Sequence, residues 1–472
     1  MYDLVIIGAG AGGLRAASTA LRAGMRVAIV EAQPEMGGDC LHHGCVPSKA
    51  LIKVAAEVHQ WRKSARLFGG QLPESLSRPL SMALVKSRVR AAIETLFYHD
   101  SDERFEAMGA DIFHARGEFI DATTLALHPS PSFEATCPAQ VTGKHFIIAT
   151  GSRPVLPPIP GLNTIDYLTN ETLFDLEALP EHLVVVGGGV IGLELGQSFA
   201  RLGSRVTVVE ASKVLLANEE PQVRDVLCQH LREELSLLSG CQVSGVTQRE
   251  GRKIAVDIQC DNEVQTLQCS HVLVAAGRRP TTDDLGLSAA GVNTHRHAIK
   301  VDAYGRTSQP HIFAVGDVNG QFAFTHAAGY QGKRVVENLL SDTVYSTDHH
   351  GMCWAIYTSP EVYHLGQTAA QLREAERNFH TVVVDPSQLD RFVTEQHPTA
   401  SVVVHLTSAG EILGAHAVGE HASDWMQSFS VAMQNGLTLE QISSGFFPYP
   451  ARTEVVLAVE RAWRDICATL SS

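Results

Sequence analysis

Two segments of the chain repeat the same pattern of apolar and polar positions. Residues 2–31 and 182–210 each open with a short apolar, β-branched run, which is typical of a buried parallel strand. Each segment then turns on glycines and continues as a helix that ends near Gly24 or Gly203. A second apolar strand closes each segment. The pattern predicts a βαβ unit in both places.

Both units carry glycines with the spacing G-x-G-x-x-G between the first strand and the helix. The first glycine allows a tight turn, the second lets the backbone approach a pyrophosphate, and the third lets the helix pack closely on the strand. A glutamate ends each second strand, where its carboxylate can bind ribose hydroxyls. The residues are Gly8, Gly10, Gly13 and Glu31 in the first unit, and Gly187, Gly189, Gly192 and Glu210 in the second. Two such sites imply two bound dinucleotides.

Glu210 also bears on the choice between NADH and NADPH. Its carboxylate would repel the extra 2′-phosphate of NADPH, which usually binds an arginine instead. We therefore expect NADH to be preferred at the second site. Arg205 and Lys213 lie nearby in the sequence and leave NADPH open as the alternative.

The pattern changes outside the two units. Residues from about 55 to 110 have apolar positions at helical spacing, and a proline cluster at 154–161 separates the first unit from the second. From about 346, apolar strands alternate with helical runs, which predicts a mixed third domain. We expect an α/β fold with two Rossmann-type domains and a C-terminal α+β domain.

Length and charge narrow the function classes. A chain of 472 residues is too long for one core, and its net charge of −14 disfavours nucleic acid as a partner. No apolar run reaches the roughly 18 residues that span a bilayer. The first residues read as a strand entering a turn, without a basic region or cleavage site. We expect a cytoplasmic protein without a transmembrane segment.

The chain has nine cysteines, and only Cys40 and Cys45 are close together. The pair flanks two histidines in "GGDCLHHGCVPSK", residues 37–49, so both a metal site and a redox disulfide are open. Five residues of regular helix rise about 7.5 Å, whereas bonded cysteines have Cα atoms within about 6.8 Å. A bonded pair therefore requires a break in the helix. We expect the other seven cysteines to be buried or incidental thiols.

Cys45 lies at the start of a predicted helix that has Pro47 in its first turn. The helix dipole stabilises a thiolate there and lowers its pKa. Asp39 beside Cys40 would tend to raise the pKa of that thiol.

The sequence resembles the class I pyridine nucleotide-disulfide oxidoreductases, the family of dihydrolipoamide dehydrogenase, glutathione reductase and mercuric reductase. "GGDCLHHGCVPSK" looks like their redox-active disulfide, and "TSQPHIFAVGD" at 307–317 resembles their second FAD motif. The resemblance extends over nearly the whole chain. It implies an FAD-binding domain at 1–150 and 278–345, an NAD(P)-binding domain at 151–277 and a dimerisation domain at 346–472.

The resemblance also implies a mechanism. NADH reduces FAD, and the flavin reduces the disulfide, with Cys45 as the charge-transfer thiolate and Cys40 as the interchange thiol. Lys49 would pair with Glu194 beside the flavin N5, and Asp317 would bind the flavin ribitol. The further residues expected at the cofactors are Gly38, Thr150, Gly151 and Gly277.

The C-terminal segment departs from the family pattern. Most members have a histidine-proline motif whose histidine, held by a glutamate, serves the interchange thiol of the partner subunit in a homodimer. In "FFPYPARTEVV" at 446–456, Glu454 matches that glutamate but Tyr449 stands in place of the histidine. A tyrosine with a pKa of about 10 is a poor general base, which weakens the case for a dithiol substrate.

The sequence leaves several electron acceptors possible. The first hypothesis is a disulfide or dithiol acceptor, as in dihydrolipoamide dehydrogenase. The alternative is a metal ion, because "FPY" followed by glutamate is similar to mercuric reductases. Quinone or oxygen reduction and a flavin-based redox sensor are further alternatives. His42 or His43 could help hold a soft metal, replace the missing acid/base or only bond within the loop. Cys467 is either half of a metal relay or an incidental thiol.

Overall fold

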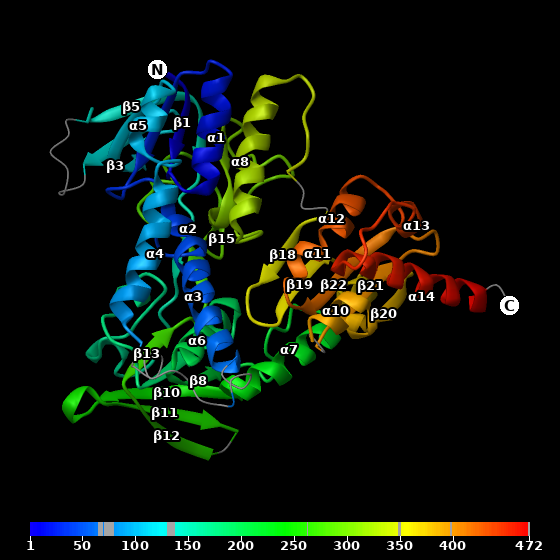
Figure 1. The fold of residues 1–472 in the computed structure, drawn as a ribbon. Helices are drawn as coiled ribbons and strands as arrows, with labels where there is room; N and C mark the ends of the chain where they lie inside the picture. Colours follow the sequence, from blue (N-terminus) through cyan, green and yellow to red (C-terminus); the bar gives the residue numbers. More distant parts are fainter. Residues whose placement is uncertain are drawn as a thin grey trace.

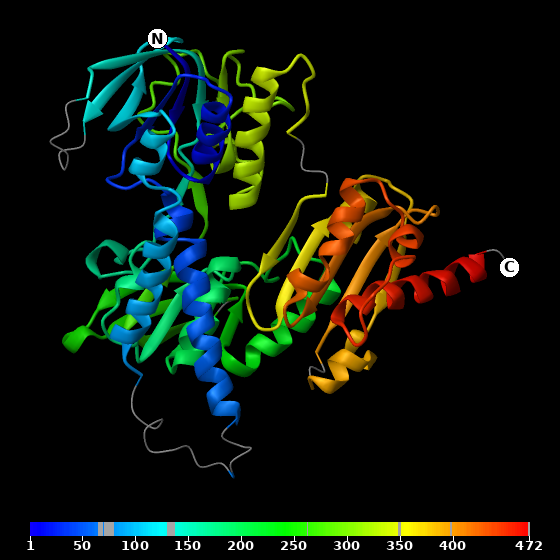
Figure 2. The same ribbon diagram turned by 45° about the horizontal axis from the view of Figure 1, so that its top comes forward.

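The computed structural model describes residues 1–64, 69, 80–129, 137–261, 263–347, 351–396 and 399–470. Two nucleotide-binding lobes lie one above the other, and a third lobe stands beside both with the C-terminal helix at its edge (Figures 1 and 2). The predicted α/β class, with a C-terminal α+β part, is confirmed. Among the described residues, no helix is long and apolar enough to cross a bilayer.

The N-terminal lobe is built on a parallel sheet whose central strand is β1 (Tyr2–Ile7). β1 lies between β2 (Val27–Glu31) and β5 (Gln140–Ile148), and β3 (Asp111–Phe119) and β17 (Ile312–Ala314) extend the sheet at either side. β4 (Thr124–Pro129) joins β3 and β5 in antiparallel register. Apolar strands fill this sheet because both of its faces are covered.

Helices α1 (Ala11–Arg22) and α8 (Thr325–Leu340) pack on one face of that sheet. They come from opposite ends of the lobe's sequence, and Figure 1 shows them side by side. A Cβ atom at Gly332 would lie 2.3 Å from the Gly12 carbonyl oxygen, so this close packing depends on glycine.

The structure confirms the helical interpretation of residues 55–110 where it describes them, with α3 (Cys45–Ser64), α4 (Met82–Phe97) and α5 (Asp102–Ala107). Residues 65–68 and 70–79 of that segment lie outside the described residues. A short helix, α2 (Gly38–His42), precedes α3. The helix breaks between α2 and α3 at His43 and Gly44, where a Cβ atom on Gly44 would meet the Asp39 carbonyl oxygen at 2.9 Å. The break lies between the two cysteines, as their spacing requires.

The second lobe repeats the βαβ plan. Its parallel sheet has the order β13 (His271–Val274), β7 (His182–Val186), β8 (Arg205–Glu210), β9 (Ser236–Ser239). Helices α6 (Val190–Leu202) and α7 (Pro221–Glu234) accompany it. An antiparallel sheet adds β10 (Cys241–Gln248), β11 (Ile254–Cys260) and β12 (Glu263–Cys269).

The chain crosses between the two nucleotide-binding lobes at β6 (Ser152–Pro154) and β14 (Arg278–Pro280). These short strands pair with one another, so both crossings lie together. A two-stranded ribbon, β15 (Thr294–His295) and β16 (Ala298–Ile299), follows on the return to the first lobe.

The C-terminal lobe has an antiparallel sheet with the order β18-β19-β22-β21-β20. The strands are β18 (Cys353–Ile356), β19 (Glu361–Gly366), β20 (His380–Val384), β21 (Ser401–Leu406) and β22 (Ile412–Gly419). The helices are α9 (Ala369–Glu374), α10 (Asp390–Thr394), α11 (Ala422–Trp425), α12 (Gln427–Gln434), α13 (Leu439–Ser443) and α14 (Val455–Leu470).

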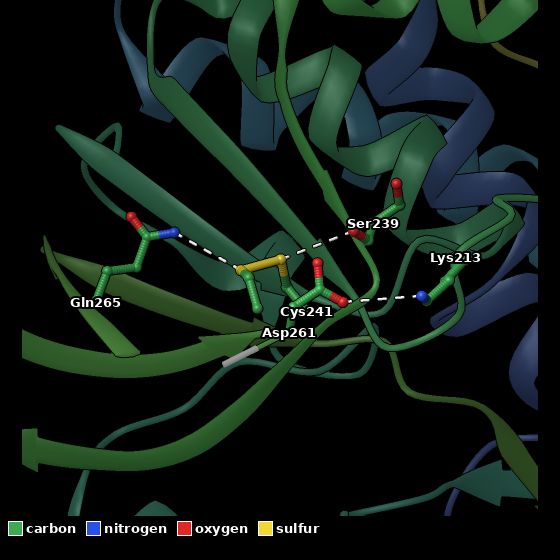
Figure 3. Close-up of a disulfide and its surroundings, with 6 residues drawn as sticks. Lys213, Ser239, Cys241, Asp261 and Gln265 are labelled. Carbon is green, nitrogen blue, oxygen red and sulfur yellow. Dashed lines mark hydrogen bonds and ion pairs between the residues drawn. A yellow bond between two sulfur atoms is a disulfide. The ribbon is translucent and has the colours of Figure 1, made fainter. Parts of the chain in front are cut away.

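One expectation about the cysteines is wrong. Cys241 and Cys260 form a disulfide between β10 and β11, where they face each other across the ladder with Cα atoms 4.2 Å apart. Figure 3 shows this bond beside Lys213 and Asp261, whose charged groups are 3.8 Å apart. The pairing depends on the register of two strands, which the spacing of cysteines along the chain does not reveal.

Candidate active site

One large cavity lies between the lobes. Its volume is about 2310 Å³, and the described residues that line it include both glycine turns, Cys40 and Cys45. Pockets for a single drug-sized ligand are usually about 300–1,000 Å³. The cavity therefore has room for two large ligands, with the cysteine pair between their sites.

The first glycine turn has the shape that a dinucleotide requires. A Cβ atom on Gly8 would lie 2.5 Å from the Ala149 carbonyl oxygen, and one on Gly13 would lie 1.9 Å from the Gly8 carbonyl oxygen. Gly10, by contrast, has nothing nearer than 3.9 Å and faces the cavity at the start of α1. Backbone N–H groups there can meet a pyrophosphate, so the turn fits FAD.

Glu31 lies at the end of β2 against the same turn. Its carboxylate accepts hydrogen bonds from the backbone N–H groups of Ala9 at 2.6 Å and Gln33 at 2.8 Å. Burial nevertheless raises the pKa of Glu31. The side chain lines the cavity, where ribose hydroxyls could also bond to it.

The second turn repeats this geometry with different residues. Cβ atoms on Gly187 and Gly192 would lie 2.3 Å and 2.1 Å from the carbonyl oxygens of Ala275 and Gly187, whereas Gly189 has open space within 4 Å. Glu210 accepts a 2.7 Å hydrogen bond from the Gly188 backbone N–H. This turn fits a second dinucleotide, as the sequence repeat predicts.

Cys40 and Cys45 are separate thiols in the structure, which corresponds to the reduced state of the pair. Cys45 is the first residue of α3, and its Sγ lies 3.3 Å from the Thr325 hydroxyl oxygen at the start of α8. Both cysteines face the cavity.

The two thiols differ in acidity. A hydrogen bond from Cys40 lowers the pKa of Cys45 to about 6, with help from the Thr325 hydroxyl and the charge of Lys49, against an opposing effect of burial. The same bond and burial raise the pKa of Cys40. Cys45 is therefore the thiolate of the pair at neutral pH. Asp39 is not among the groups that raise the pKa of Cys40.

Asp39 is instead held by Asn170 and by Arg278 of the crossing strand. Its carboxylate lies 3.3 Å from Arg278 of β14 and accepts a 3.2 Å hydrogen bond from the Asn170 side chain. Arg278 also donates to the Ser152 hydroxyl at 2.8 Å. We call Asp39, Asn170 and Arg278 the Asp39 clamp.

Lys49 and Glu194 lie together beside the cysteines. The Lys49 Nζ is 2.8 Å from a Glu194 carboxylate oxygen, and Glu194 is almost fully buried. The other carboxylate oxygen accepts a 2.8 Å hydrogen bond from the Tyr357 backbone N–H, and the Tyr357 ring lies 4.5 Å from Nζ. The Lys49 charge therefore lies at the cavity, and it also neutralises the buried Glu194 carboxylate, which would be costly if left unpaired.

The remaining residues expected at the cofactors also border the cavity. Asp317 accepts a 2.5 Å hydrogen bond from the Ser152 hydroxyl, and Thr150 donates to the Thr281 carbonyl oxygen at 2.7 Å. Gly38, Gly151 and Gly277 all line the cavity with positive φ angles. Their contacts with a cofactor stay a prediction.

His42 bonds within its own loop. Its Nε2 lies 2.8 Å from the Met36 carbonyl oxygen, and its Nδ1 lies 3.7 Å from a Glu35 carboxylate oxygen. Among the described residues, neither His42 nor His43 joins Cys40 and Cys45 in a group of three potential metal ligands.

Tyr449 and Glu454 lie in the C-terminal lobe and do not line the cavity of their own chain. The Tyr449 side chain is 73% exposed, and its hydroxyl donates to Asp390, which raises the pKa of Tyr449. Glu454 accepts a 3.0 Å hydrogen bond from the Ala451 backbone N–H. If either residue serves Cys40, it must do so from a second subunit.

Comparison with known proteins decides the family. The family described as pyridine nucleotide-disulphide oxidoreductase matches residues 2–332, and its dimerisation domain matches residues 352–459. The chain belongs to this family. Its members are FAD-dependent oxidoreductases that use NAD(P)H and act on disulfides or on Hg(II), which confirms the expected cofactors and enzyme class. The dimerisation domain supports the expected homodimer.

Individual relatives of this oxidoreductase span nearly its whole length. A mercuric reductase of Streptomyces lividans is 34% identical, covering 100% of this chain and 98% of its own. A dihydrolipoyl dehydrogenase of Geobacillus stearothermophilus is 30% identical, covering 96% and 94%. Among solved structures, the Cu(II) complex of the HOCl-induced flavoprotein disulfide reductase RclA from Escherichia coli has a TM-score of 0.84 and 26% identity, covering 97% of this chain and 98% of its own.

Sequence reasoning missed several residues of the oxidoreductase site. Thr325 and Tyr357 approach the pair from far along the chain, and Arg278 reaches Asp39 through the crossing strand β14. The available signal was "VAAGRRP" at 274–280, in which two arginines come shortly after a buried strand.

Proposed function

We propose that this oxidoreductase transfers electrons from NAD(P)H through the Cys40–Cys45 pair to a soft metal ion, mercuric or cupric, that both sulfurs bind. The supporting observation is the pair itself: one stabilised thiolate and one thiol, open to the cavity, with tyrosine where most members have a catalytic histidine. Thiolates are the ligands that soft ions prefer.

Bound FAD would supply two-electron transfer from the nicotinamide to the disulfide. Two electrons and one proton open that bond into a Cys45 thiolate and a Cys40 thiol. Cys40 and Thr325 hold the thiolate through hydrogen bonds, and Lys49 adds a positive charge nearby. A bound mercuric ion displaces the Cys40 proton to water, takes two electrons from the two sulfurs and leaves as the metal while the disulfide forms again. With cupric ion, two ions would take one electron each and leave as cuprous ions.

Proton chemistry favours an ion over a disulfide as acceptor. Attack on a disulfide requires Cys40 as a thiolate, but its pKa is raised, and the nearby His42 is bonded to Met36 and Glu35. A metal ion displaces the thiol proton by itself. Tyr449 of a second subunit could donate a hydrogen bond there but is a weak base.

A disulfide or dithiol acceptor is the second candidate. The likeness to a dihydrolipoyl dehydrogenase and to a flavoprotein disulfide reductase supports it. Glu454 also keeps the place of the orienting glutamate. In this alternative, Cys40 attacks one sulfur of the acceptor and Cys45 then closes the enzyme disulfide.

We propose NADH as the preferred donor. Glu210 lies at the carboxyl end of β8, whereas Arg205 begins that strand, about 17 Å away at 3.3 Å per residue. Arg205 bonds to His182 at 2.9 Å, and Lys213 pairs with Asp261 at 3.8 Å. Both cations therefore have other partners, which supports NADH. A lower Michaelis constant for NADPH than for NADH would overturn this.

An acceptor panel tests the proposal. NADH oxidation by the FAD-loaded homodimer is measured with mercuric ion, cupric ion, lipoamide, glutathione disulfide and a quinone, with Cys45→Ser as the control. We expect the ions to support the fastest cysteine-dependent turnover. Faster turnover with lipoamide or glutathione disulfide favours the second candidate, cysteine-independent quinone or oxygen reduction overturns both, and no turnover indicates a redox sensor.

Tyr449→His tests the reason for the preference. An imidazole at this position restores a general base, so lipoamide turnover should rise by about 10²-fold, a typical contribution of acid–base catalysis. Ion reduction should change little. Unchanged lipoamide turnover in a folded variant would show that Tyr449 does not limit dithiol exchange.

We also propose a cytoplasmic location, where pyridine nucleotides are available and thiols such as Cys40 and Cys45 stay reducible. Cell fractionation with an antibody against the chain tests this, and recovery outside the cytoplasm would contradict it.

A further inference from the structure

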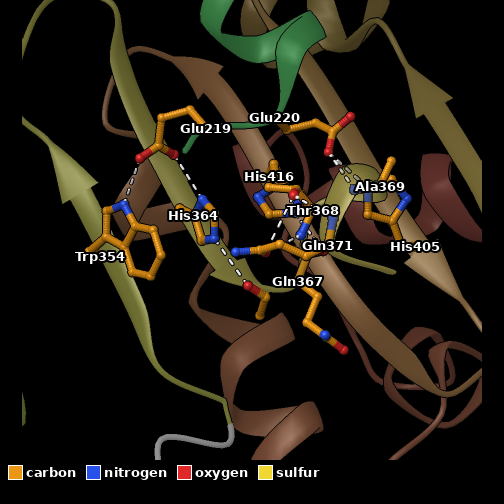
Figure 4. A network of polar contacts seen from close by, with 11 residues as sticks. Glu219, Glu220, Trp354, His364, Gln367, Thr368, Ala369, Gln371, His405 and His416 are labelled. Carbon is orange, nitrogen blue, oxygen red and sulfur yellow. Dashed lines mark hydrogen bonds and ion pairs between the residues drawn. The ribbon is translucent and has the colours of Figure 1, made fainter. Parts of the chain in front are cut away.

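A buried polar cluster lies where the second nucleotide-binding lobe meets the C-terminal sheet, and none of its five side chains lines the active-site cavity. Trp354, which donates a 2.9 Å hydrogen bond to Glu219, separates the cluster from that cavity. Glu219 and Glu220 directly precede α7, and His364, His405 and His416 come from β19, β21 and β22. All five side chains are less than 9% exposed. Figure 4 shows the glutamates reaching from the start of α7 toward the histidines on the sheet.

The cluster holds two glutamate–histidine pairs and a third histidine. His364 Nδ1 lies 2.8 Å from Glu219, and its Nε2 lies 3.0 Å from the Gly366 carbonyl oxygen. His405 Nε2 lies 3.1 Å from Glu220, and its Nδ1 has a partner too. The third histidine, His416, lies beside His405 and has a buried Nδ1 without a hydrogen-bond partner among the described residues.

The contact of His416 Nε2 determines which ring nitrogen of His416 carries the proton. Nε2 lies 3.1 Å from the Gln367 carbonyl oxygen, which can only accept, so Nε2 carries the proton. Nδ1 therefore presents an unused lone pair inside the protein, which is costly for a buried group.

We propose that Glu220, His405 and His416 form a resident site for a divalent transition-metal ion, with Zn²⁺ as the preferred occupant. One potential ligand atom from each residue lies within 4.8 Å of the others. Two imidazoles and one carboxylate are a donor set that zinc uses. The 3.1 Å between His405 Nε2 and the Glu220 oxygen is close to the separation of about 3.3 Å between neighbouring ligands of tetrahedral zinc.

Each of the three donors is held by an outer partner, as metal ligands usually are. The Glu220 carboxylate accepts a 2.9 Å hydrogen bond from the Ala369 backbone N–H. His405 Nδ1 lies 3.1 Å from the Thr381 hydroxyl, and the Gln367 carbonyl holds His416. An ion would replace the proton between His405 and Glu220 and would also bind the free nitrogen of His416.

The site would join two lobes, because Glu220 belongs to the nucleotide-binding lobe and both histidines to the dimerisation sheet. The ion has a structural role here and is distinct from the ion proposed as substrate at Cys40 and Cys45. The inference does not rest on the proposed function, since it uses none of the cavity residues.

Zinc binding by the FAD-loaded full chain carrying Cys40→Ser and Cys45→Ser tests the site without the active-site thiols. After chelation and equilibrium dialysis against zinc, we expect one ion per chain by mass spectrometry. Zinc K-edge absorption should show nitrogen and oxygen ligands at about 2.0–2.1 Å, imidazole scattering and no sulfur.

Variants assign the ion to its ligands. Glu220→Gln and His405→Gln should each weaken zinc binding at least about tenfold, whereas His364→Gln, at the neighbouring pair, should keep the wild-type affinity. Absence of retained zinc, sulfur ligands in the spectrum, or unchanged affinity in a folded Glu220→Gln protein would each overturn the site. The first two measurements need no ligand variant, so a misfolded variant leaves the test intact.

Discussion

Two cysteine pairs lie at or beside the cavity, which Cys40, Cys45 and Cys241 line, and the pairs differ in their bonding and their surroundings. Cys40 and Cys45 flank a break between two helices, and a hydrogen bond, a hydroxyl and a lysine stabilise one sulfur as a thiolate. Cys241 and Cys260 face each other across two antiparallel strands and are bonded. The comparison shows that pairs next to one cavity can differ in thiol acidity and bonding because their surroundings differ.

Removing one sulfur from each pair gives the largest contrast. Cys45→Ser should reduce cysteine-dependent turnover on the order of 10⁴-fold or more, as loss of an enzyme nucleophile does. Cys241→Ser should leave turnover within about threefold, because Cys241 has no part in the relay. Steady-state NADH oxidation measures both, and an equal loss in the two variants would break the comparison.

Stability should show the reverse contrast. The Cys241–Cys260 bond closes a loop with a sequence separation of 19, so its loss should lower the free energy of unfolding by about 3 kcal/mol. Denaturant unfolding of the oxidised protein and of Cys241→Ser measures the difference. A reducing agent should lower the stability of the wild type to that of the variant. Equal stability of all three would indicate that this disulfide does not form in solution.

The acidity of Cys45 predicts a pH dependence. Because its pKa is about 6, the thiolate is present above that pH and is protonated as the pH falls through it. The charge-transfer absorbance of the reduced, FAD-loaded enzyme should therefore be half lost near pH 6. A midpoint near pH 8.5, the ordinary value for cysteine, would show that the surroundings do not stabilise the thiolate.

The smallest expected effects are shifts in the pKa of Cys45, which distinguish the contributions of its neighbouring groups. Cys40→Ala removes the strongest stabilising contact and should raise the absorbance midpoint the most. Lys49→Met should raise it by up to about one unit. Glu194→Gln should lower the midpoint instead, because the Glu194 charge opposes the thiolate. A shift of the same sign in the Lys49 and Glu194 variants would contradict this electrostatic account.

Local patterns in the sequence predicted the two βαβ units, the glycine turns and the helix break at the redox pair. These features depend on neighbours within about 30 residues, so periodicity and spacing can report them. Thr325 contacts Cys45 across 280 positions. Cys241 meets Cys260, and His405 meets Glu220, only through strand register and the packing of lobes. Such contacts are set by tertiary structure, and a single sequence carries no direct signal for them.

The Asp39 clamp has a mechanical consequence. Arg278 lies on β14, which with β6 forms the double crossing between the nucleotide-binding lobes, and it holds the residue directly before Cys40. Asn170 and Arg278 therefore tie the residue directly before Cys40 to the place where the chain passes from one lobe to the other. The seating of the two lobes and the position of the Cys40 backbone thus share one set of polar contacts.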